Sequence, residues 1–380
     1  MTVRIAIIAG YAPSLVNFRG HLLKTLEHLG AEILLIAPGL TTDILRPLNL
    51  QKAEIIDLPM AHQGTNPFRD LASCYFLWRC FRKFSPDIVL AYTAKPVIYA
   101  TLAASLAAVT KRYALITGLG SAFTPKTMTP AYITWVMTQL YSLALRYNTA
   151  VIFQNTDDEK LFREKKILSA PVPSYVVNGS GVDLQHFSLS PLPESATFLL
   201  IARLLIDKGI REYVAAAAQI KLKHPQVRFL VAGPIDNNPT AISPRELQSW
   251  IDEGTVEYLG FLKDVRPAIT QCSIYVLPSY REGTPRSILE AMAMGRPIIT
   301  TDAPGCRETV KHGVNGYLIP VHDVNALVAS MEKLIVSPDL RYQFGIASRY
   351  IAEEKYDVHK VNQQMLMAMQ LTNTLLSFTK

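Results

Sequence analysis

Two glutamates, Glu282 and Glu290, stand in the chain with seven residues between them. The first lies in a polar loop after a short apolar run at 274–277, and the second lies on a helix expected to begin near Ser287. A carboxylate accepts paired hydrogen bonds from neighbouring hydroxyls of a ribose or hexose ring. The pair therefore predicts recognition of sugar hydroxyls, although a helix cap beside a solvated helix glutamate is the ordinary alternative for this spacing alone.

The loop at 282–286 also predicts an anion site. It joins the carboxyl end of a strand to the amino-terminus of a helix, where backbone amides and the helix dipole attract anionic oxygen. A nucleotide diphosphate suits such a site. Another expected strand, 198–202, is followed by Arg203, Lys208 and Gly209. Two cations there suit a departing diphosphate, whose leaving oxygen gains charge in the transition state, and an ordinary surface Arg and Lys are the alternative.

From Pro278 to Gly316 the chain resembles the retaining glycosyltransferases of family 4, which have an E-x7-E signature. The resemblance implies an α/β chain with the GT-B fold: two doubly wound, Rossmann-like domains that face a cleft, and a C-terminal helix that crosses back to the first domain. It further implies a hexosyltransferase that needs no metal and no cofactor besides its UDP-sugar co-substrate.

The resemblance also assigns roles to residues. Glu290 would hold the ribose of a sugar nucleotide and Glu282 the transferred sugar, while Arg203 and Lys208 would hold the pyrophosphate. Glu282, Arg203 and Lys208 are thus the expected catalytic residues. The other expected donor-binding positions are the loop backbone, a uracil pocket and the loop after the first strand: Gly283, Thr284, Pro285, Arg286, Phe261, Leu262 and Gly10. For the loop after the first strand, contact with the acceptor and an ordinary connecting role remain open.

Three segments, 93–99, 117–123 and 279–307, are similar to family members that add N-acetylgalactosamine, or a similar N-acetylhexosamine, in α-1,3 linkage to undecaprenyl-diphosphate-linked sugars. The positions expected near the acceptor or the sugar are Ser14, Thr93, Lys95, Thr117 and Gly118. Many relatives carry a His where this chain has Thr93 or Lys95, so the residue that replaces it stays open. Lys95 suits an acceptor phosphate, the donor, or a solvated rim position.

Apolar strand candidates alternate with helical stretches through both halves of the chain, which is typical of doubly wound parallel sheets. A cluster of Gly and Pro at 179–193 indicates a boundary. We therefore expect an acceptor-binding domain at 1–180, joined by a C-terminal helix at about 358–380, and a nucleotide-sugar-binding domain at 181–357. A chain of 380 residues is also expected to form two domains, because it is too long for a single hydrophobic core.

The net charge of +7 lies wholly in the first half, where residues 1–170 hold 18 Lys and Arg against 11 Asp and Glu. The chain lacks the motifs of nucleic-acid-binding domains, so nucleic acid is not the expected partner. Aromatic and basic residues interleave over 68–84, as in an interfacial helix. A sheet-covering role is the alternative there, and the favoured one for the uncharged stretch 127–145, which is too polar to span a bilayer. We expect the protein at the anionic inner face of the cell membrane, peripherally bound from the cytoplasm.

The four cysteines and eight histidines show no metal-ligand spacing, and no GxGxxG follows the first strand. A zinc site and a dehydrogenase are therefore disfavoured. No signal peptide is expected, since the segment at 3–9 reads as a strand. The expected function is transfer of an N-acetylhexosamine, best taken as GalNAc, from UDP to a polyprenyl-diphosphate-linked saccharide. A sugar-nucleotide epimerase or hydrolase of the same fold, and a sugar-nucleotide-binding protein without activity, are the alternatives.

Overall fold

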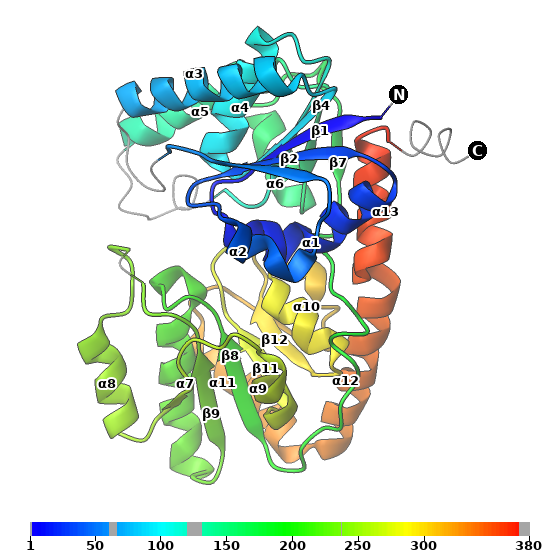
Figure 1. The fold of residues 1–380 in the computed structure, drawn as a ribbon. Helices are drawn as coiled ribbons and strands as arrows, with labels where there is room; N and C mark the ends of the chain where they lie inside the picture. The colour runs from blue at the N-terminus through cyan, green and yellow to red at the C-terminus, as the bar shows by residue number, and fades with distance from the viewer. Residues whose placement is uncertain (1, 61–66, 120–130, 237, 372–380) are drawn as a thin grey trace. The chain divides into compact units, whose positions relative to one another are not determined.

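A computed structural model describes residues 2–60, 67–119, 131–236 and 238–371. The chain divides into two compact units (Figure 1). Unit 1 contains residues 1–180 and 359–380, and unit 2 contains residues 181–358. The division falls within the Gly-containing segment that the sequence marks as a boundary. The last residues assigned to the expected C-terminal helix, 372–380, lie outside the described part of the chain.

Unit 1 is built on a parallel sheet with strand order β3-β2-β1-β4-β5-β6-β7. Its strands are β1 (Arg4–Ile8), β2 (Glu32–Ala37), β3 (Ala53–Asp57), β4 (Ile88–Tyr92), β5 (Lys111–Ile116), β6 (Ala150–Phe153) and β7 (Ser174–Val176). Its helices are α1 (Pro13–His28), α2 (Thr42–Leu45), η1 (Arg46–Leu48), α3 (Pro67–Phe84), α4 (Ala94–Leu106), α5 (Ala131–Leu145), α6 (Thr156–Glu164) and α13 (Val358–Ala368).

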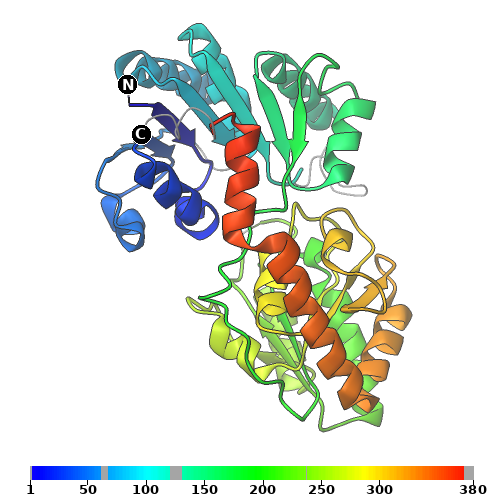
Figure 2. The same cartoon turned by 90° about the vertical axis from the view of Figure 1, so that its right-hand side faces the viewer.

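Helices cover both faces of this sheet. Buried side chains of α3, α4, α5 and α6 pack with those of the strands in one apolar cluster. Buried side chains of α1 and of the segment around α13 pack in a second cluster against the other face, and Figure 2 shows α13 in red. Because the four central strands are buried on both faces, they read as continuous apolar runs.

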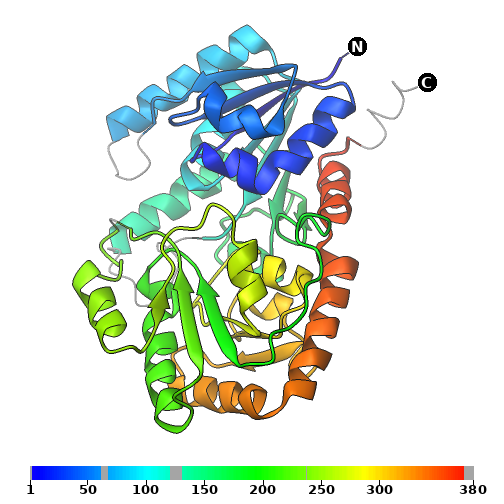
Figure 3. The ribbon, with the colours of Figure 1, turned by 60° about the horizontal axis from the view of Figure 1, so that its bottom comes forward.

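Unit 2 repeats the design with strand order β10-β9-β8-β11-β12-β13, again all parallel, and its green strands β8 and β9 are seen in Figure 3. Its strands are β8 (Thr197–Ile201), β9 (Arg228–Ala232), β10 (Glu257–Tyr258), β11 (Ile274–Leu277), β12 (Ile298–Thr301) and β13 (Gly316–Ile319). Its helices are η3 (Ile206–Lys208), α7 (Ile210–Lys223), α8 (Pro244–Asp252), α9 (Arg266–Gln271), α10 (Arg286–Ala293), η4 (Arg307–Thr309), α11 (Val324–Val336), α12 (Pro338–Ile351) and η5 (Ala352–Tyr356).

Both sheets have the strand order of a dinucleotide-binding fold, in which the order reverses beside the first strand. In unit 1 this switch point lies between β1 and β4, and in unit 2 it lies between β8 and β11. In folds of this strand order, ligands bind outside the carboxyl ends of the strands at such a switch point. The two-domain Rossmann-like fold expected from the sequence is confirmed.

The expected elements are present, with shifted ends. The first helix begins at Pro13, because a proline fits the first helical turn, where its missing N–H costs nothing. The helix after the E-x7-E loop begins at Arg286, one residue before the expected Ser287. Strand β13 and helices α2, α9 and α11 were not predicted. The chain leaves η5 at Tyr356 and then enters α13, near the expected start of the C-terminal helix.

Candidate active site

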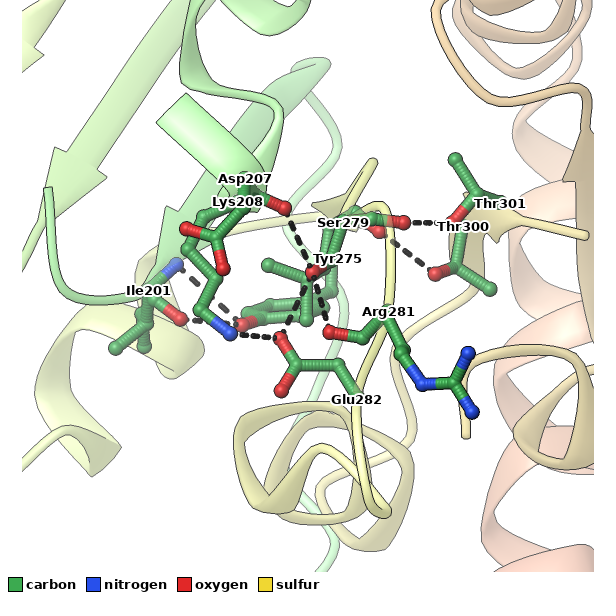
Figure 4. Close-up of polar contacts among 10 residues, drawn as sticks. Ile201, Asp207, Lys208, Tyr275, Ser279, Arg281, Glu282, Thr300 and Thr301 are labelled. Carbon is green, nitrogen blue, oxygen red and sulfur yellow. Dashed lines mark hydrogen bonds and ion pairs between the residues drawn. The ribbon is translucent and has the colours of Figure 1, made fainter. Parts of the chain in front are cut away.

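The switch point of unit 2 brings together two of the predicted catalytic residues (Figure 4). Lys208 ends η3, which follows β8, while Glu282 lies in the loop after β11. The ammonium of Lys208 donates to Oε1 of Glu282 across 2.6 Å, and both side chains are largely buried, with exposed fractions of 14% and 18%. The hydroxyl of Ser279 donates to the same carboxylate oxygen at 2.9 Å. A cation and a carboxylate are therefore fixed side by side.

Two loops hold this pair in place. The backbone carbonyl of Asp207 accepts from the amide of Tyr280 at 2.9 Å. It also lies 3.1 Å from the hydroxyl of Ser279, whose single proton it shares with Glu282. The phenol of Tyr280 donates to Glu212, near the start of α7, at 2.6 Å. The loop after β11 is thus bonded to the segment after β8 at several points, so Lys208 and Glu282 cannot separate without breaking this network.

Glycines allow these loops to approach so closely. Gly209 has a φ of 70°, and a Cβ there would lie 2.1 Å from the carbonyl oxygen of Pro278. Gly305, in the loop after β12, has a φ of 79°, and its Cβ would lie 2.3 Å from the carbonyl oxygen of Glu282. Neither position accommodates another residue without moving backbone. The amide of Glu282 also donates to the carbonyl of Pro304 at 2.9 Å, so three loops define its position.

The electrostatics of the site favour a charged Lys208. Burial opposes the ammonium form, but the carboxylates of Glu282 and Asp207 outweigh burial, and the pKa of Lys208 is raised. The residue therefore stays cationic at neutral pH. An ammonium has three N–H donors, and the bond to Glu282 uses one of them. Lys208 can accordingly donate to a phosphate oxygen while it holds the carboxylate.

Glu290 lies on α10, where it accepts from Nε of Arg286 across 2.8 Å. Burial raises the pKa of Glu290, while the guanidinium of Arg286 counteracts part of this effect. The expected donor loop ends at the amino-terminus of α10, capped by Pro285 without a side-chain hydrogen bond. Pro285 has no N–H, so the expected amide contacts to a donor fall to Gly283, Thr284 and Arg286.

Arg203 lies apart from this network. Its guanidinium donates to Oδ2 of Asp236 at 3.3 Å, and its side chain is 58% exposed. To hold a diphosphate it would turn from one anion to another, which an exposed Arg does at little cost. Phe261 is also exposed, as a base-stacking residue would be, whereas Leu262 is partly buried and packs against the core of unit 2.

In unit 1 the switch point brings together Gly10 and Thr93. Thr93 caps α4 with a φ of 68° and a ψ of 157°, a conformation otherwise restricted to glycine. Its buried hydroxyl has no hydrogen-bond partner, and a Cβ on Gly10 would lie 2.4 Å from that oxygen. A strained residue that offers an unused hydroxyl at the carboxyl edge of a parallel sheet is typical of a ligand site.

Ser14 lies beside this position, at the start of α1. Its hydroxyl shares a 2.8 Å hydrogen bond with the phenol of Tyr92, the last residue of β4, and burial raises the pKa of Tyr92 to about 12. The guanidinium of Arg19 lies over the Tyr92 ring, with 5.4 Å between the Cζ atom and the ring centroid. Ser14 is 5% exposed, so it supports the loop after β1 from within the unit.

Lys95 is not the solvated rim residue that was one of the alternatives. Its ammonium donates to Asp70 of α3 at 2.8 Å, and the side chains are 19% and 10% exposed. The phenol of Tyr99 donates to the other carboxylate oxygen at 2.9 Å. Thr117 and Gly118 follow β5 at the same edge of the sheet. Residues 120–123, part of the segment that supported the closer resemblance, lie outside the described residues.

The structure brings Lys208 and Glu282 together and adds partners that the sequence did not indicate. Ser279, Asp207 and Tyr280 complete the network around Glu282, and Asp70 anchors Lys95. Ser279 lies three residues before Glu282 in the same loop, so a local pattern could have indicated this partner. Asp70 lies on a helix remote in sequence, and no local pattern indicated it. Among the described residues, no cluster of three or more His, Cys, Asp and Glu could hold a metal ion.

Comparison with known proteins defines the class. Residues 20–155 match the family model described as glycosyl transferase 4-like, and residues 195–337 match the model described as glycosyl transferases group 1. Each model covers the greater part of one unit. The chain belongs to the family 4 glycosyltransferases, and it is a glycosyltransferase of the GT-B fold.

Among individual relatives, the chain is 28% identical to the N,N'-diacetylbacillosaminyl-diphospho-undecaprenol alpha-1,3-N-acetylgalactosaminyltransferase of Campylobacter jejuni. That alignment covers 96% of this chain and 97% of the relative. The chain is 25% identical to the capsular polysaccharide biosynthesis glycosyltransferase CapM of Staphylococcus aureus, over 76% and 78% of the two chains.

Solved structures share the fold. A crystal structure of HepE from Anabaena in complex with UDP matches with a TM-score of 0.77 and 19% identity, over 97% of this chain and all of that one. Sucrose-phosphate synthase from Thermosynechococcus elongatus matches with a TM-score of 0.79 and 17% identity, over 99% of both chains.

Proposed function

We propose that the protein is a retaining, metal-independent hexosyltransferase that moves an N-acetylhexosamine, best taken as GalNAc in α-1,3 linkage, from a UDP donor to a polyprenyl-diphosphate-linked saccharide. The observation that carries the proposal is the fixed pairing of Lys208 with Glu282 beside the amino-terminus of α10. This arrangement offers positive charge and a helix amino-terminus to a diphosphate, and a carboxylate to the attached sugar.

The donor would lie across the carboxyl edge of the unit 2 sheet. Phe261 would contact the uracil ring, Glu290 would accept from the ribose hydroxyls, and the loop amides would meet the diphosphate. Arg203 and Lys208 would neutralise the charge that the leaving diphosphate gains. A solved neighbour of the same fold contains UDP, which supports this choice of nucleotide.

The transfer step would proceed on one face of the sugar. The bond between the anomeric carbon and the β-phosphate oxygen breaks, and the acceptor oxygen forms the new bond from the same side. The acceptor proton passes to the departing phosphate oxygen, so UDP leaves protonated and no protein base is required. Glu282 would hold the sugar in position for this displacement, because its carboxylate is itself held by Lys208 and Ser279.

The acceptor assignment rests on the relative from Campylobacter jejuni, which is named for an undecaprenyl-diphosphate-linked substrate. In this chain, Gly10, Thr93 and Lys95 would define the acceptor side, together with Thr117 and Gly118. A lipid-linked acceptor would place the protein at the inner face of the cell membrane, bound from the cytoplasm. The basic excess of the first half of the chain suits an anionic membrane surface.

The test is a panel of UDP sugars, with release of UDP measured with and without a lipid-diphosphate saccharide. We expect UDP-GalNAc to be consumed when the acceptor is present, with retention of configuration in the product. Glu282→Gln should lower kcat more than it raises the KM for the donor. Glu332→Gln, a change on the surface of unit 2, serves as the matched control and should leave both unchanged.

The outcomes separate the alternatives. Turnover of the donor at full rate without any acceptor would indicate a hydrolase or an epimerase, and donor binding with no turnover under any acceptor would indicate a binding protein. An unchanged kcat for Glu282→Gln would show that the carboxylate does not position the sugar.

A further inference from the structure

Helix α3 presents an unusual outward face. Phe68, Leu71 and Tyr75 are 83%, 69% and 59% exposed. They recur at helical spacing, so they share one side of the helix, opposite the buried Leu77 and Phe81 that pack on the sheet. This side is therefore apolar although it faces solvent.

Helix α5 has a similar outward face. Tyr132 and Trp135 are 68% and 64% exposed, and Val136 and Leu143 are 41% and 44% exposed. The helix contains no charged residue from end to end. Its inward side, with Tyr141 at 3% exposed, packs on the sheet as expected from the sequence. The outward side was not expected to be so rich in exposed apolar groups.

The two helices belong to one layer. Both pack against α4, and buried side chains of all three join the same apolar cluster on one face of the unit 1 sheet (Figure 1). Because α3 follows β3 and α5 precedes β6 in a parallel sheet, both helices begin at its carboxyl edge and run back toward its amino edge. The exposed aromatic residues lie in the first half of each helix, so they gather toward the edge that carries Thr93 and Gly118.

Charge distinguishes this surface from an ordinary apolar patch. Arg79, Arg82 and Lys83 are exposed on the second half of α3, and Arg146 is exposed just after α5. Asp70 is the one acidic residue within α3, and it is buried against Lys95. The surface of both helices thus combines apolar side chains with positive charge.

We propose that the outward faces of α3 and α5 together form a surface that lies flat on an anionic lipid bilayer, with the aromatic residues inserted among the headgroups. Exposed aromatic side chains flanked by arginines are the composition of interfacial helices. Within the described chain, no helix has both the length and the apolar character to cross a bilayer, so these helices can lie on a membrane but not span it. A second copy of the chain would meet this surface with like charge.

The surface on α3 and α5 would provide the membrane contact proposed above. Only its role in presenting a lipid-linked acceptor rests on the proposed function. The bilayer would hold the polyprenyl tail of the acceptor. Since the inserted residues gather toward the carboxyl edge of the unit 1 sheet, the saccharide would be presented near the loops that carry Thr93 and Gly118. Binding to lipid itself requires neither donor nor acceptor.

The experiment is vesicle flotation of the full chain, with phosphatidylglycerol-rich vesicles compared with phosphatidylcholine vesicles. Tyr132→Ser with Trp135→Ser should lower partitioning to anionic vesicles roughly tenfold, because two inserted aromatic groups are lost. The matched control is Tyr342→Ser with Tyr350→Ser, two side chains on α12 that are each 63% exposed, and it should bind as the parent chain does.

A second pair of changes tests the electrostatic part. Each basic side chain near an anionic surface contributes roughly fivefold to partitioning, so Arg79→Gln with Arg82→Gln should lower it about 25-fold on anionic vesicles. The same pair should have little effect on neutral vesicles. Added salt should weaken binding of the parent chain in the same direction.

A site-specific measurement makes the outcome independent of folding defects. With Trp78→Phe and Trp250→Phe, Trp135 is the remaining tryptophan of the three in the chain. Its fluorescence should shift to the blue with anionic vesicles and be quenched by brominated lipid. No shift and no quenching would overturn the proposal. So would a lipid-independent dimer, seen by light scattering, that the α5 variant abolishes. Turnover of a water-soluble acceptor analogue, measured in parallel, reports on the proposed function separately.

Discussion

Replacing Lys208 by Met tests the central pair of the candidate site. Methionine keeps most of the side-chain volume and removes the ammonium that lies 2.6 Å from Glu282. The carboxylate then stays in a site where 18% of its side chain is exposed, supported by the hydroxyl of Ser279. Removing one partner of a buried ion pair costs about 3–5 kcal/mol of stability. Since Ser279 and some water remain, we expect a loss near the lower end, about 3 kcal/mol.

A matched surface pair provides the control. Lys223 donates to Glu332 at 2.7 Å, almost the same distance, but the two side chains are 67% and 32% exposed. Water screens this pair, so Lys223→Met should cost about 0.5 kcal/mol. The two ion pairs have nearly the same N···O distance but differ in burial. The loss of stability should therefore be severalfold larger for Lys208→Met than for Lys223→Met.

The measurement is urea unfolding followed by circular dichroism, for Lys208→Met, Lys223→Met, Glu282→Gln and the double variant Lys208→Met with Glu282→Gln. The double variant leaves no charge unpaired, so it should be more stable than Lys208→Met alone. If Lys208→Met costs no more than Lys223→Met, or if the double variant loses the sum of its single changes, the pair is not a buried, coupled unit and the reasoning fails.

The same pair predicts a pH dependence. The pKa of Lys208 is raised in the folded chain above its ordinary value of 10.5, because Glu282 and Asp207 outweigh the effect of burial. A raised lysine pKa stabilises the folded state fully below the unfolded value and loses this contribution as pH rises through the folded value. The stability difference between the parent chain and Lys208→Met should therefore shrink above about pH 10.5.

Three further predictions concern neighbouring features. Gly305→Ala should raise the KM for the donor and cost about 2 kcal/mol of stability, because the added Cβ would displace the backbone of Glu282; kinetics identical to those of the parent chain would contradict this. Thr93→Gly should stabilise the chain by about 1 kcal/mol, since it relieves the strained backbone, and should lower turnover if the hydroxyl contacts substrate; a gain in stability with unchanged turnover would exclude that contact. Removal of divalent metal with EDTA should leave turnover unchanged, and a loss restored by magnesium would refute metal independence.

Local sequence was enough to predict the type of most of the longer elements. Parallel strands buried on both faces leave continuous apolar runs, and the helices between them leave a 3.6-residue period, so the alternation identified two doubly wound sheets. The residues that end strands were also visible, because Gly, Pro and polar groups interrupt the apolar runs there. Arg203, Lys208 and Glu282 follow such strand ends, whereas Glu290 lies on a helix, and the resemblance to family 4 glycosyltransferases assigned the roles of all four.

Tertiary structure decided which of these residues meet. Lys208 and Glu282 are 74 residues apart, and their bond depends on β8 and β11 being neighbours in the sheet. The contact of Gly10 with Thr93 depends in the same way on β1 lying beside β4. Strand order is set when the whole sheet assembles. Neither the spacing of apolar residues nor the composition of a single segment specifies it. For the same reason the sequence could show that α5 covers the sheet but not that its opposite side, with Trp135, faces solvent, since exposure depends on which neighbours the fold supplies.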